Sequence, residues 1–144
     1  ETEQRLRERR NAGTNCVSHI LQDMAAGHMR SPDFQQSILA ARGRYLGQRE
    51  LLVSALKQHG VTVSEHHDGL NVWVPLAHNS AATVMQMAQR GWLIRGGEGF
   101  MLDSTSSGLR ITVSELDAPE TELIAKSLAG ILSQQRQIQA TNKV

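Results

Sequence analysis

Two stretches of sequence decide the fold, Gly69-Leu70-Asn71-Val72-Trp73-Val74-Pro75-Leu76 and Gly108-Leu109-Arg110-Ile111-Thr112-Val113-Ser114. Both have the composition of β-strands, and side chains alternate between the two faces of a strand. In the second stretch this alternation gathers the apolar side chains on one face, at Leu109, Ile111 and Val113. The pattern predicts a strand whose other face carries Arg110, Thr112 and Ser114.

Arg110 is the residue of this strand that invites a functional interpretation. An arginine opposite an apolar face can simply extend into solvent, as most arginines do. Its planar guanidinium can also bind a carboxylate through two parallel hydrogen bonds. The residues of the strand alone leave both interpretations open.

The segment between the two strands predicts a helix, a short strand and a turn. Asn79-Ser80 is a typical helix cap, and the helix should end near Arg90-Gly91. Residues 92–94 are expected to form a short strand. The cluster Gly96-Gly97-Glu98-Gly99-Phe100 lacks the spacing of dinucleotide- and phosphate-binding loops. We interpret it as a tight turn or bulge.

Helices are predicted before the first strand. Apolar residues at helical spacing indicate an amphipathic helix over 15–29. Ser31-Pro32 then starts a long helix, with serine as the N-cap and proline in the first turn. Its apolar pattern runs from about 33 to 58 and stops before His59-Gly60. Residues 61–65 indicate a strand that forms a hairpin with the strand that follows.

The C-terminal part predicts one more helix. Asp117-Ala118-Pro119-Glu120 has the spacing of a capping box, and an apolar stripe follows it as far as Leu132. The Gln-rich segment 134–144 is expected to fray. Taken together, the elements predict an α+β domain with a small antiparallel or mixed sheet of about four strands and helices packed on one face.

Composition limits the functional classes. The chain has 144 residues, of which 40% are hydrophobic and 20% charged, with a net charge of +1. This balance is typical of one globular domain and does not predict a nucleic-acid surface on this chain. Cys16 is the one cysteine, and no apolar run reaches the roughly 20 residues of a membrane helix. A soluble, cytoplasmic protein is expected.

Two further segments carry clusters of charged or metal-ligating side chains. His66, His67 and Asp68 invite a metal site, but adjacent histidines on a strand point to opposite faces and no further ligand has zinc-like spacing, so we expect no metal. Residues 1–10 mix arginine and glutamate at helical spacings, which favours a solvated helix face over a phosphate-binding arm. The chain starts as if inside a helix, and we expect it to be a fragment of a longer protein.

The order of these motifs resembles the C-terminal small domain of fold-type-I pyridoxal-phosphate (PLP) aminotransferases. Within that group it is most similar to the aminotransferase-like effector domain of MocR-type (GntR superfamily) transcriptional regulators, and among these to a regulator of PLP supply. The matching motifs stand at 43–52, 69–73, 91–100 and 109–114. The resemblance covers about 30–132. It implies N-terminal helices over 1–29 that continue from a large domain upstream, a small domain over 30–133 and a tail over 134–144.

The resemblance also implies site residues. The family's arginine at the position of Arg110 binds the carboxylate of an amino-acid substrate or effector. Asn71 stands where the family has histidine and is expected to share the carboxylate. Arg95 begins the segment where the family usually has Pro-Gly, and it could add a second anion contact. No catalytic residue is expected in this chain.

The implied cofactor is PLP in the intact protein. The family's PLP-binding lysine lies upstream of the matched region. The lysines here are Lys57, Lys126 and Lys143, in the long helix, the last helix and the tail, and none is expected in a pocket suited to an imine.

Three functions follow as hypotheses. The first is an effector domain that senses PLP or an amino compound and controls DNA binding by a winged-helix domain outside this chain, in a homodimer. The second is the small domain of a genuine PLP-dependent aminotransferase, with Arg110 orienting a substrate. The third is a free-standing α+β interaction module. The irregular glycine cluster and Asn71 favour the regulator over the enzyme.

Overall fold

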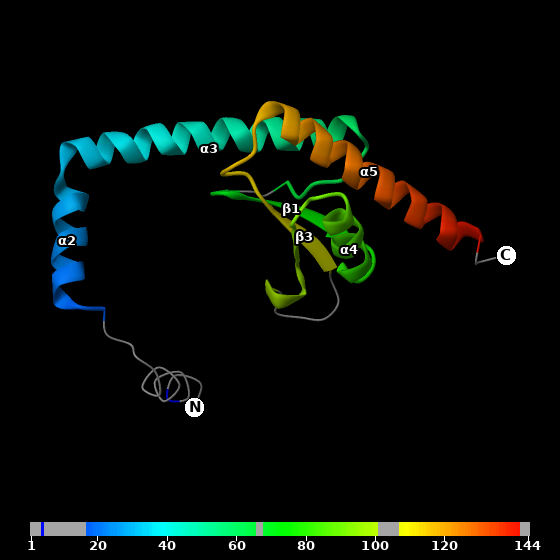
Figure 1. Cartoon of the computed structure of the whole chain (residues 1–144), viewed down its shortest axis with the longest axis horizontal. Helices are drawn as coiled ribbons and strands as arrows, with labels where there is room; N and C mark the ends of the chain where they lie inside the picture. Colours follow the sequence, from blue (N-terminus) through cyan, green and yellow to red (C-terminus); the bar gives the residue numbers. More distant parts are fainter. Residues whose placement is uncertain (1–3, 5–16, 66–67, 101–106, 142–144) are drawn as a thin grey trace. The chain divides into compact units, whose positions relative to one another are not determined.

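The structure of the protein, a computed structural model, describes residues 4, 17–65, 68–100 and 107–141. It divides into two compact units, residues 1–41 and 42–144. Figure 1 shows its elements, which in chain order are α2 (His19–Arg30), α3 (Pro32–Gln58), β1 (Asn71–Leu76), α4 (Ala81–Gln89), β2 (Arg95–Gly96), the short 3₁₀ helix η1 (Glu98–Phe100), β3 (Ser107–Thr112) and α5 (Ala118–Thr141).

The first unit contains α2 and the beginning of α3. α2 confirms the amphipathic helix expected over 15–29, and none of its residues is buried. Its apolar side chains include Ile20 and Met24, which are 71% and 56% exposed. The charged helix expected over 1–10 and its cap lie outside the described residues, apart from Gln4. The apolar stripe of α2 is therefore uncovered within the described part of this unit.

α3 begins and ends where the sequence predicts. It starts directly after Ser31 and stops at Gln58. Gly60 has a φ of +72°, and the N–H of Val61 donates to the carbonyl of Leu56 over 2.9 Å. This arrangement is the Schellman motif, which suits glycine because a side chain is strained at positive φ. It turns the chain sharply after the helix.

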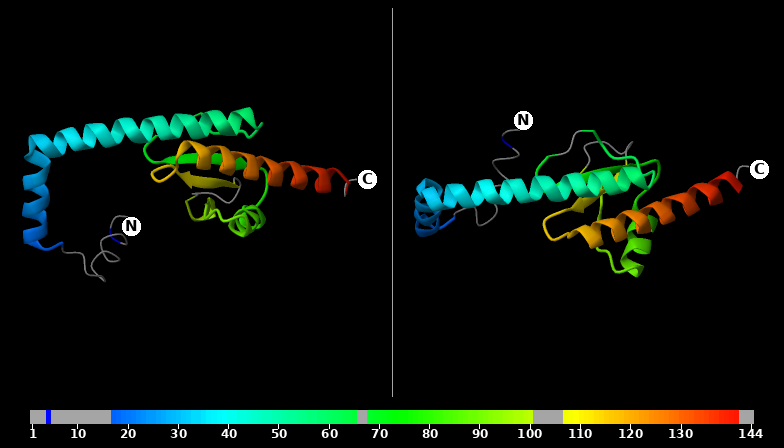
Figure 2. Two further views of the ribbon diagram at one scale, coloured as in Figure 1. Left: turned by 45° about the horizontal axis from the view of Figure 1, so that its top comes forward. Right: turned by 90° about the horizontal axis from the view of Figure 1, so that it is seen from above.

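The second unit is built on a three-stranded antiparallel sheet in the order β1-β3-β2. β3 pairs with β1 along its whole length, with Val72 opposite Ile111 and Val74 opposite Leu109. β2 is a two-residue edge strand on the other side of β3. The end of α3 and α5 both lie over one face of the sheet in the views of Figure 2. The predicted α+β class, with helices packed on one face of the sheet, is therefore confirmed.

Two strand predictions were wrong. Residues 61–64 are extended, and the N–H of Ser64 donates to the carbonyl of Trp73, but the segment has no strand assignment and the described sheet has three strands instead of about four. Val61 and Val63 are buried all the same, which explains why their alternating pattern resembled a strand. The short strand expected over 92–94 instead lies at β2. The N–H of Trp92 is used at the end of α4, where it donates to the carbonyl of Met87 over 2.9 Å.

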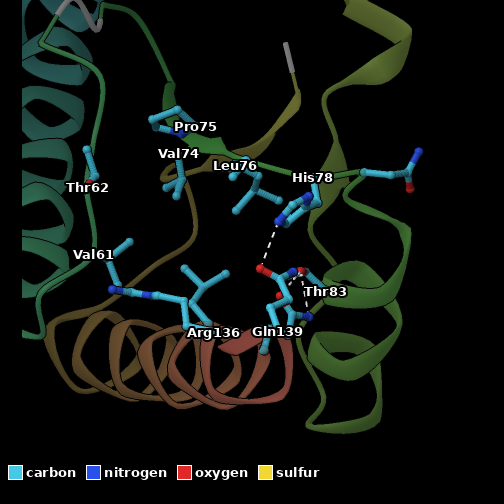
Figure 3. Close-up of a pocket in the computed structure, with 13 residues that line it drawn as sticks. Val61, Thr62, Val74, Pro75, Leu76, His78, Thr83, Arg136 and Gln139 are labelled. Carbon is cyan, nitrogen blue, oxygen red and sulfur yellow. Dashed lines mark hydrogen bonds between the residues drawn. The ribbon is translucent and has the colours of Figure 1, made fainter. Parts of the chain in front are cut away.

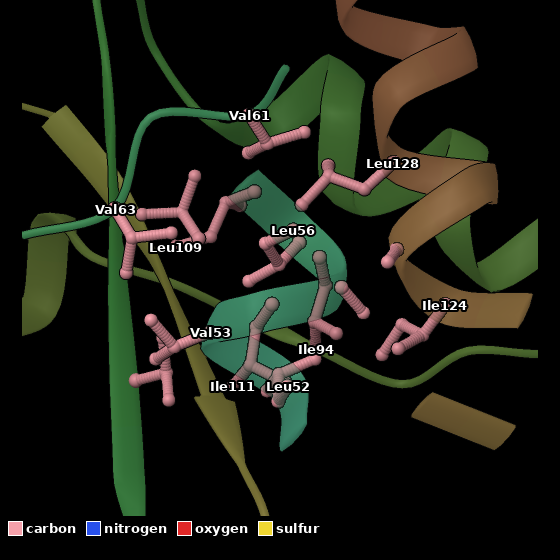
Figure 4. Close-up of a cluster of buried hydrophobic side chains, with 14 of the residues drawn as sticks. Leu52, Val53, Leu56, Val61, Val63, Ile94, Leu109, Ile111, Ile124 and Leu128 are labelled. Atoms are coloured by element: carbon pink, nitrogen blue, oxygen red, sulfur yellow. The ribbon is translucent and has the colours of Figure 1, made fainter. Parts of the chain in front are cut away.

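The core fills the space between the sheet and its helices. Figure 4 shows Leu52 and Leu56 of α3 beside strand and α5 side chains. The buried cluster consists of Leu52, Val53, Ala55, Leu56, Val61, Val63, Val72, Val74, Met87, Ile94, Leu109, Ile111, Val113, Ile124, Ala125, Leu128 and Ile131. It is aliphatic, as the low aromatic content requires. Leu109, Ile111 and Val113 all belong to it, so the alternation predicted for β3 is confirmed.

The two remaining helices complete the unit. α4 packs against α5 and β2. α5 starts with the predicted capping box, in which the N–H of Glu120 donates to Asp117 Oδ1 and the N–H of Asp117 donates to Glu120 Oε2, over 2.8 and 3.1 Å. It continues to Thr141, through most of the segment expected to fray. None of the helices in the described ranges has the length and hydropathy of a membrane span.

Candidate functional site

The face of the sheet opposite the core carries the candidate site. Residues directly opposite each other in a sheet share a face, so the register identifies its members. Arg110 of β3 lies between Trp73 of β1 and Arg95 of β2. Asn71 lies opposite Thr112 on the same face. The structure thus brings the three sequence-predicted residues Asn71, Arg95 and Arg110 onto one surface.

Arg110 is half-buried at the centre of this face. Its guanidinium carbon lies 4.3 Å from the centre of the Phe100 ring, which is the geometry of a cation–π contact. Its Nε is buried, and no hydrogen-bond acceptor for it lies among the described residues. A buried donor without a partner is costly, and it gains most from an added acceptor. Arg110 therefore stacks on Phe100 and keeps one guanidinium donor without an acceptor among the described residues.

The other two predicted residues lie on either side of Arg110. Asn71 Oδ1 accepts a hydrogen bond from the Thr112 hydroxyl over 2.9 Å, which leaves the amide N–H groups of Asn71 as donors. Arg95 is exposed and directly opposite Arg110. Two like charges at this spacing repel each other, so an anion bound between them would be favoured. Asn71, Arg95 and Arg110 thus place hydrogen-bond donors side by side on this face.

Sequence reasoning missed how closely Trp73 approaches two glycines. A Cβ atom at Gly97 would lie 2.1 Å from Cη2 of the Trp73 indole, and one at Gly108 would lie 2.4 Å from its Cζ2. The half-buried indole therefore rests directly against the backbone at both positions. The glycine cluster confirms the expected tight turn, since the N–H of Phe100 donates to the Gly97 carbonyl over 2.9 Å within η1. The N–H of Gly97 donates to the Gly108 carbonyl over 2.7 Å, which extends the pairing of β2 with β3. The two glycines are 24 and 35 residues away from Trp73 in the sequence, so no local pattern signals this contact.

Glu98 was missed as well, and it ties the site to α4. Its carboxylate accepts hydrogen bonds from the Ser80 hydroxyl, the Ser80 N–H and the Ser107 hydroxyl over 2.6, 2.7 and 2.8 Å. The Ser80 hydroxyl is the largest of the interactions that lower the pKa of Glu98 from 4.5 to about 2. Gly96 makes room for this contact, because a Cβ there would lie 2.3 Å from Ser80 Oγ. Glu98 thus joins η1 to the starts of α4 and β3.

This carboxylate makes a pH-dependent contribution to stability. Because the folded pKa of Glu98 lies below its unfolded value, the contribution is complete above pH 4.5 and is lost as the pH falls towards about 2. We expect Glu98→Gln to lower the free energy of unfolding at pH 7, with a deficit that shrinks between pH 4.5 and 2. Urea unfolding at several pH values measures it. The matched control is Glu115→Gln, an exposed carboxylate without a hydrogen-bond partner in the described chain; a deficit of Glu98→Gln that stays constant with pH contradicts the assignment.

The described residues offer no side chains suited to a metal ion or to an imine with PLP. No group of three His, Cys, Asp or Glu side chains within the described ranges could hold a metal ion, and the pair His66–His67 lies outside them. Lys57 and Lys126 are exposed on α3 and α5, away from the open face of the sheet, and Lys143 is outside the described residues. These side chains do not fit an imine-forming PLP site, so no chemical step through PLP is derived for this chain.

The protein is an α+β domain whose antiparallel sheet has helices on one face and two arginines, Arg95 and Arg110, on the other. An aromatic aminotransferase from Pyrococcus horikoshii OT3 has this fold, with a TM-score of 0.71 at 14% identity, covering 92% of this chain and 36% of that chain. A structure described as Pyrococcus protein-A1 gives the same TM-score and identity and is covered to 35%. At this identity, the likeness establishes the fold.

Sequence comparison establishes the family. The family described as aminotransferase class I and II matches residues 5–128, and the chain belongs to it. The vitamin B6 salvage pathway transcriptional repressor PtsJ of Salmonella typhimurium (strain LT2) is 39% identical over 127 residues, which cover 88% of this chain and 29% of the repressor. The resemblance to aminotransferase-like regulators of the MocR type is confirmed, and PtsJ is a regulator of the kind expected among them. The chain spans less than a third of that relative's length.

Proposed function

We propose that this chain is part of the aminotransferase-like effector domain of a PLP-responsive transcriptional regulator. PLP or an amino compound is the effector, and it controls DNA binding by a winged-helix domain outside this chain. The similarity to PtsJ supports this proposal because that relative is a repressor of vitamin B6 salvage. The effector's carboxylate binds Arg110 and Asn71, and Arg95 makes a second contact with an anionic group.

Arg110 carries the proposal. Its guanidinium is held against Phe100, and its buried Nε has no acceptor among the described residues. A side chain held in its binding geometry loses little conformational entropy when the ligand arrives. Asn71 supports the same carboxylate from a diagonal position on β1, within reach of a small ligand because diagonal neighbours in a sheet lie about 7–8 Å apart.

Arg110→Ala tests the proposal in the intact protein. We expect affinity for carboxylate-bearing effectors to fall about tenfold or more, because hydrogen bonds to a charged partner each contribute about 1.5–3 kcal/mol. The fold should remain stable, since the side chain lies outside the apolar core. Calorimetric titration with an amino acid or the PLP adduct of one measures the affinity, and an operator-binding assay measures the effect on DNA binding.

Arg44→Ala is the matched control because it removes an exposed guanidinium of α3 that contacts its neighbour Tyr45 and no residue of the open face. Its effector affinity should equal that of the unchanged protein. Unchanged affinity in Arg110→Ala would overturn the assigned role of Arg110. A longer protein that binds no DNA would overturn the regulator while leaving the carboxylate site intact.

The PLP-binding lysine lies outside this chain in our proposal. Lys57 and Lys126 are exposed on helices remote from the open face, which supports this placement. The bound cofactor would supply an electron-accepting ring next to the effector. This chain would contribute the carboxylate contacts that orient an amino compound towards it.

A genuine aminotransferase is the second candidate, because the family match is to aminotransferases class I and II. In that case Arg110 orients a substrate carboxylate next to PLP. The two candidates separate in the longer protein purified from its native source. A winged-helix segment and operator binding without amino-group transfer support the regulator, whereas turnover of an amino acid and a keto acid supports the enzyme.

The assembly is proposed on the same basis. The intact protein forms a homodimer in the cytoplasm, with its effector sites near the subunit boundary, as the family resemblance implies. The uncovered apolar side chains of α2 are available for contacts with the large domain. Sedimentation of the intact protein as a monomer would overturn the dimer.

A further inference from the structure

The second unit contains a pocket of about 200 Å³ that is separate from the open face of the sheet. None of Asn71, Arg95 and Arg110 lines it. Figure 3 shows it between the end of β1, the start of α4 and the last turns of α5. The lining residues are Val61, Thr62, Val74, Pro75, Leu76, Ala77, His78, Asn79, Thr83, Leu132, Gln135, Arg136 and Gln139.

The pocket has an apolar floor. Val61 and Val74 are buried, and Leu76 and Leu132 pack against the same core. An apolar cavity of about 150 Å³ can hold benzene. A space of about 200 Å³ therefore fits one aromatic ring or a branched aliphatic group together with a small polar head.

The polar rim is largely fixed by internal hydrogen bonds. His78 Nε2 and Gln139 Oε1 are 2.9 Å apart. Thr83 Oγ1 lies 3.2 and 3.3 Å from the two amide atoms of Gln135. The first pair connects the loop after β1 to α5, and the second connects α4 to α5. Together they hold the walls of the pocket in place. The rim is preorganised, so ligand binding need not order it.

Arg136 is the exception on this rim. It is the one residue of the lining with a permanent charge, and no Asp or Glu lines the pocket. Among the described residues, no hydrogen-bond or ion-pair partner of its guanidinium is present. Figure 3 shows its side chain extending from α5 towards Val61, above the apolar floor. An anionic group at this end of the pocket would meet a cation that has no competing carboxylate.

We propose that this pocket binds a small apolar monocarboxylate, with the apolar group on the valine and leucine floor and the carboxylate on Arg136. This pocket is independent of the proposed effector site on the open face. Its α5 wall, from Leu132 to Gln139, lies beyond residue 128, where the family match ends. The pocket therefore uses a part of the chain that the family match does not include.

Benzoate is the probe for this proposal, with benzyl alcohol as its uncharged counterpart. In an amide NMR titration of the full chain, we expect saturable shifts at Thr62, Leu76 and Gln139. Benzoate should bind about fivefold to tenfold more tightly than benzyl alcohol, because a charge-assisted hydrogen bond to an exposed arginine is partly screened. Arg136→Gln should remove this difference and leave benzyl alcohol binding unchanged.

A second variant separates this pocket from the open face of the sheet. Arg110→Gln should leave the benzoate shifts at Thr62 and Gln139 unchanged, even where it abolishes carboxylate binding beside Trp73. The proposal is overturned when benzoate shifts only residues of the open face, or when Arg136→Gln binds benzoate as tightly as the unchanged chain. Arg136 is exposed, so both titrations can be made on folded protein, which the dispersion of the spectra verifies.

Discussion

Leu128→Ala should lower the free energy of unfolding by about 3 kcal/mol, because deleting a fully buried leucine side chain removes apolar burial and leaves a cavity. Leu128 is 0% exposed and lies on α5 within the core cluster that α3, α5 and the sheet enclose. Figure 4 shows its side chain directed towards that cluster. Because most of the cluster belongs to helices and strands, we expect little relaxation into the cavity. Urea unfolding followed by circular dichroism measures the loss.

The matched control for this change is Leu123→Ala on the same helix. Leu123 is 55% exposed, so the same deletion should cost less than about 1 kcal/mol. Both variants replace leucine by alanine within α5, so the change in helix propensity is the same in each. Equal losses in the two variants would contradict the packing of α5 against the sheet.

Gly97→Ala should lower the free energy of unfolding by about 2 kcal/mol, the middle of the range for overpacked sites. The new methyl group would lie 2.1 Å from the Trp73 indole and 2.8 Å from the carbonyl oxygen of Gly108. Moving the indole away would expose part of it, and the carbonyl belongs to the paired strand β3. The fluorescence of Trp73 should change together with the stability, because the variant displaces its ring.

Gly99→Ala provides the comparison within the same glycine cluster. No atom of the described residues lies within 4 Å of a Cβ built at Gly99, and its φ is not in the left-handed region. We expect a change within about 0.5 kcal/mol and an unaltered indole signal. If Gly97→Ala is as harmless as Gly99→Ala, the close contact between Trp73 and the backbone is not present in solution.

Local patterns predicted the elements whose signals lie within a few residues. The alternation of Leu109, Ile111 and Val113 identified the core face of β3, and all three are buried. The capping box of Asp117 and Glu120 located the start of α5 within one residue. These signals work because hydrogen bonds at a helix end and the pleat of a strand depend on near neighbours in the sequence.

The segment at 61–64 illustrates where such patterns fail. Its alternating valines are buried, as the strand prediction required, but the backbone was expected to pair fully with β1. Burial of alternate side chains needs only an extended chain against the core, whereas a strand also needs a partner in register. The periodicity could therefore predict the burial of alternate side chains but not the pairing with a neighbouring strand.

The sequence named three residues of the candidate site, Asn71, Arg95 and Arg110, but it could not predict the contacts that they make. The alternation of side chains placed Arg110 on the face opposite the core. The family resemblance implied that it binds the carboxylate of a substrate or effector. The contact with Phe100, the register with Arg95 and the support of Asn71 by Thr112 depend on chain pairings distant in sequence. The bridge from Glu98 to Ser80 spans 18 residues between a turn and a helix start, and its local sequence resembles that of any polar turn.

The strand order β1-β3-β2 has a consequence for biosynthesis. β3 is the last strand to leave the ribosome, yet it is the central strand with which both others pair. Until residues 107–112 have emerged, β1 and β2 have no strand to pair with, and the apolar side of β1 stays open to other contacts. The nascent chain therefore carries an unfinished sheet from the synthesis of β1 until the synthesis of β3, a stage at which a chaperone would find an exposed strand edge to protect.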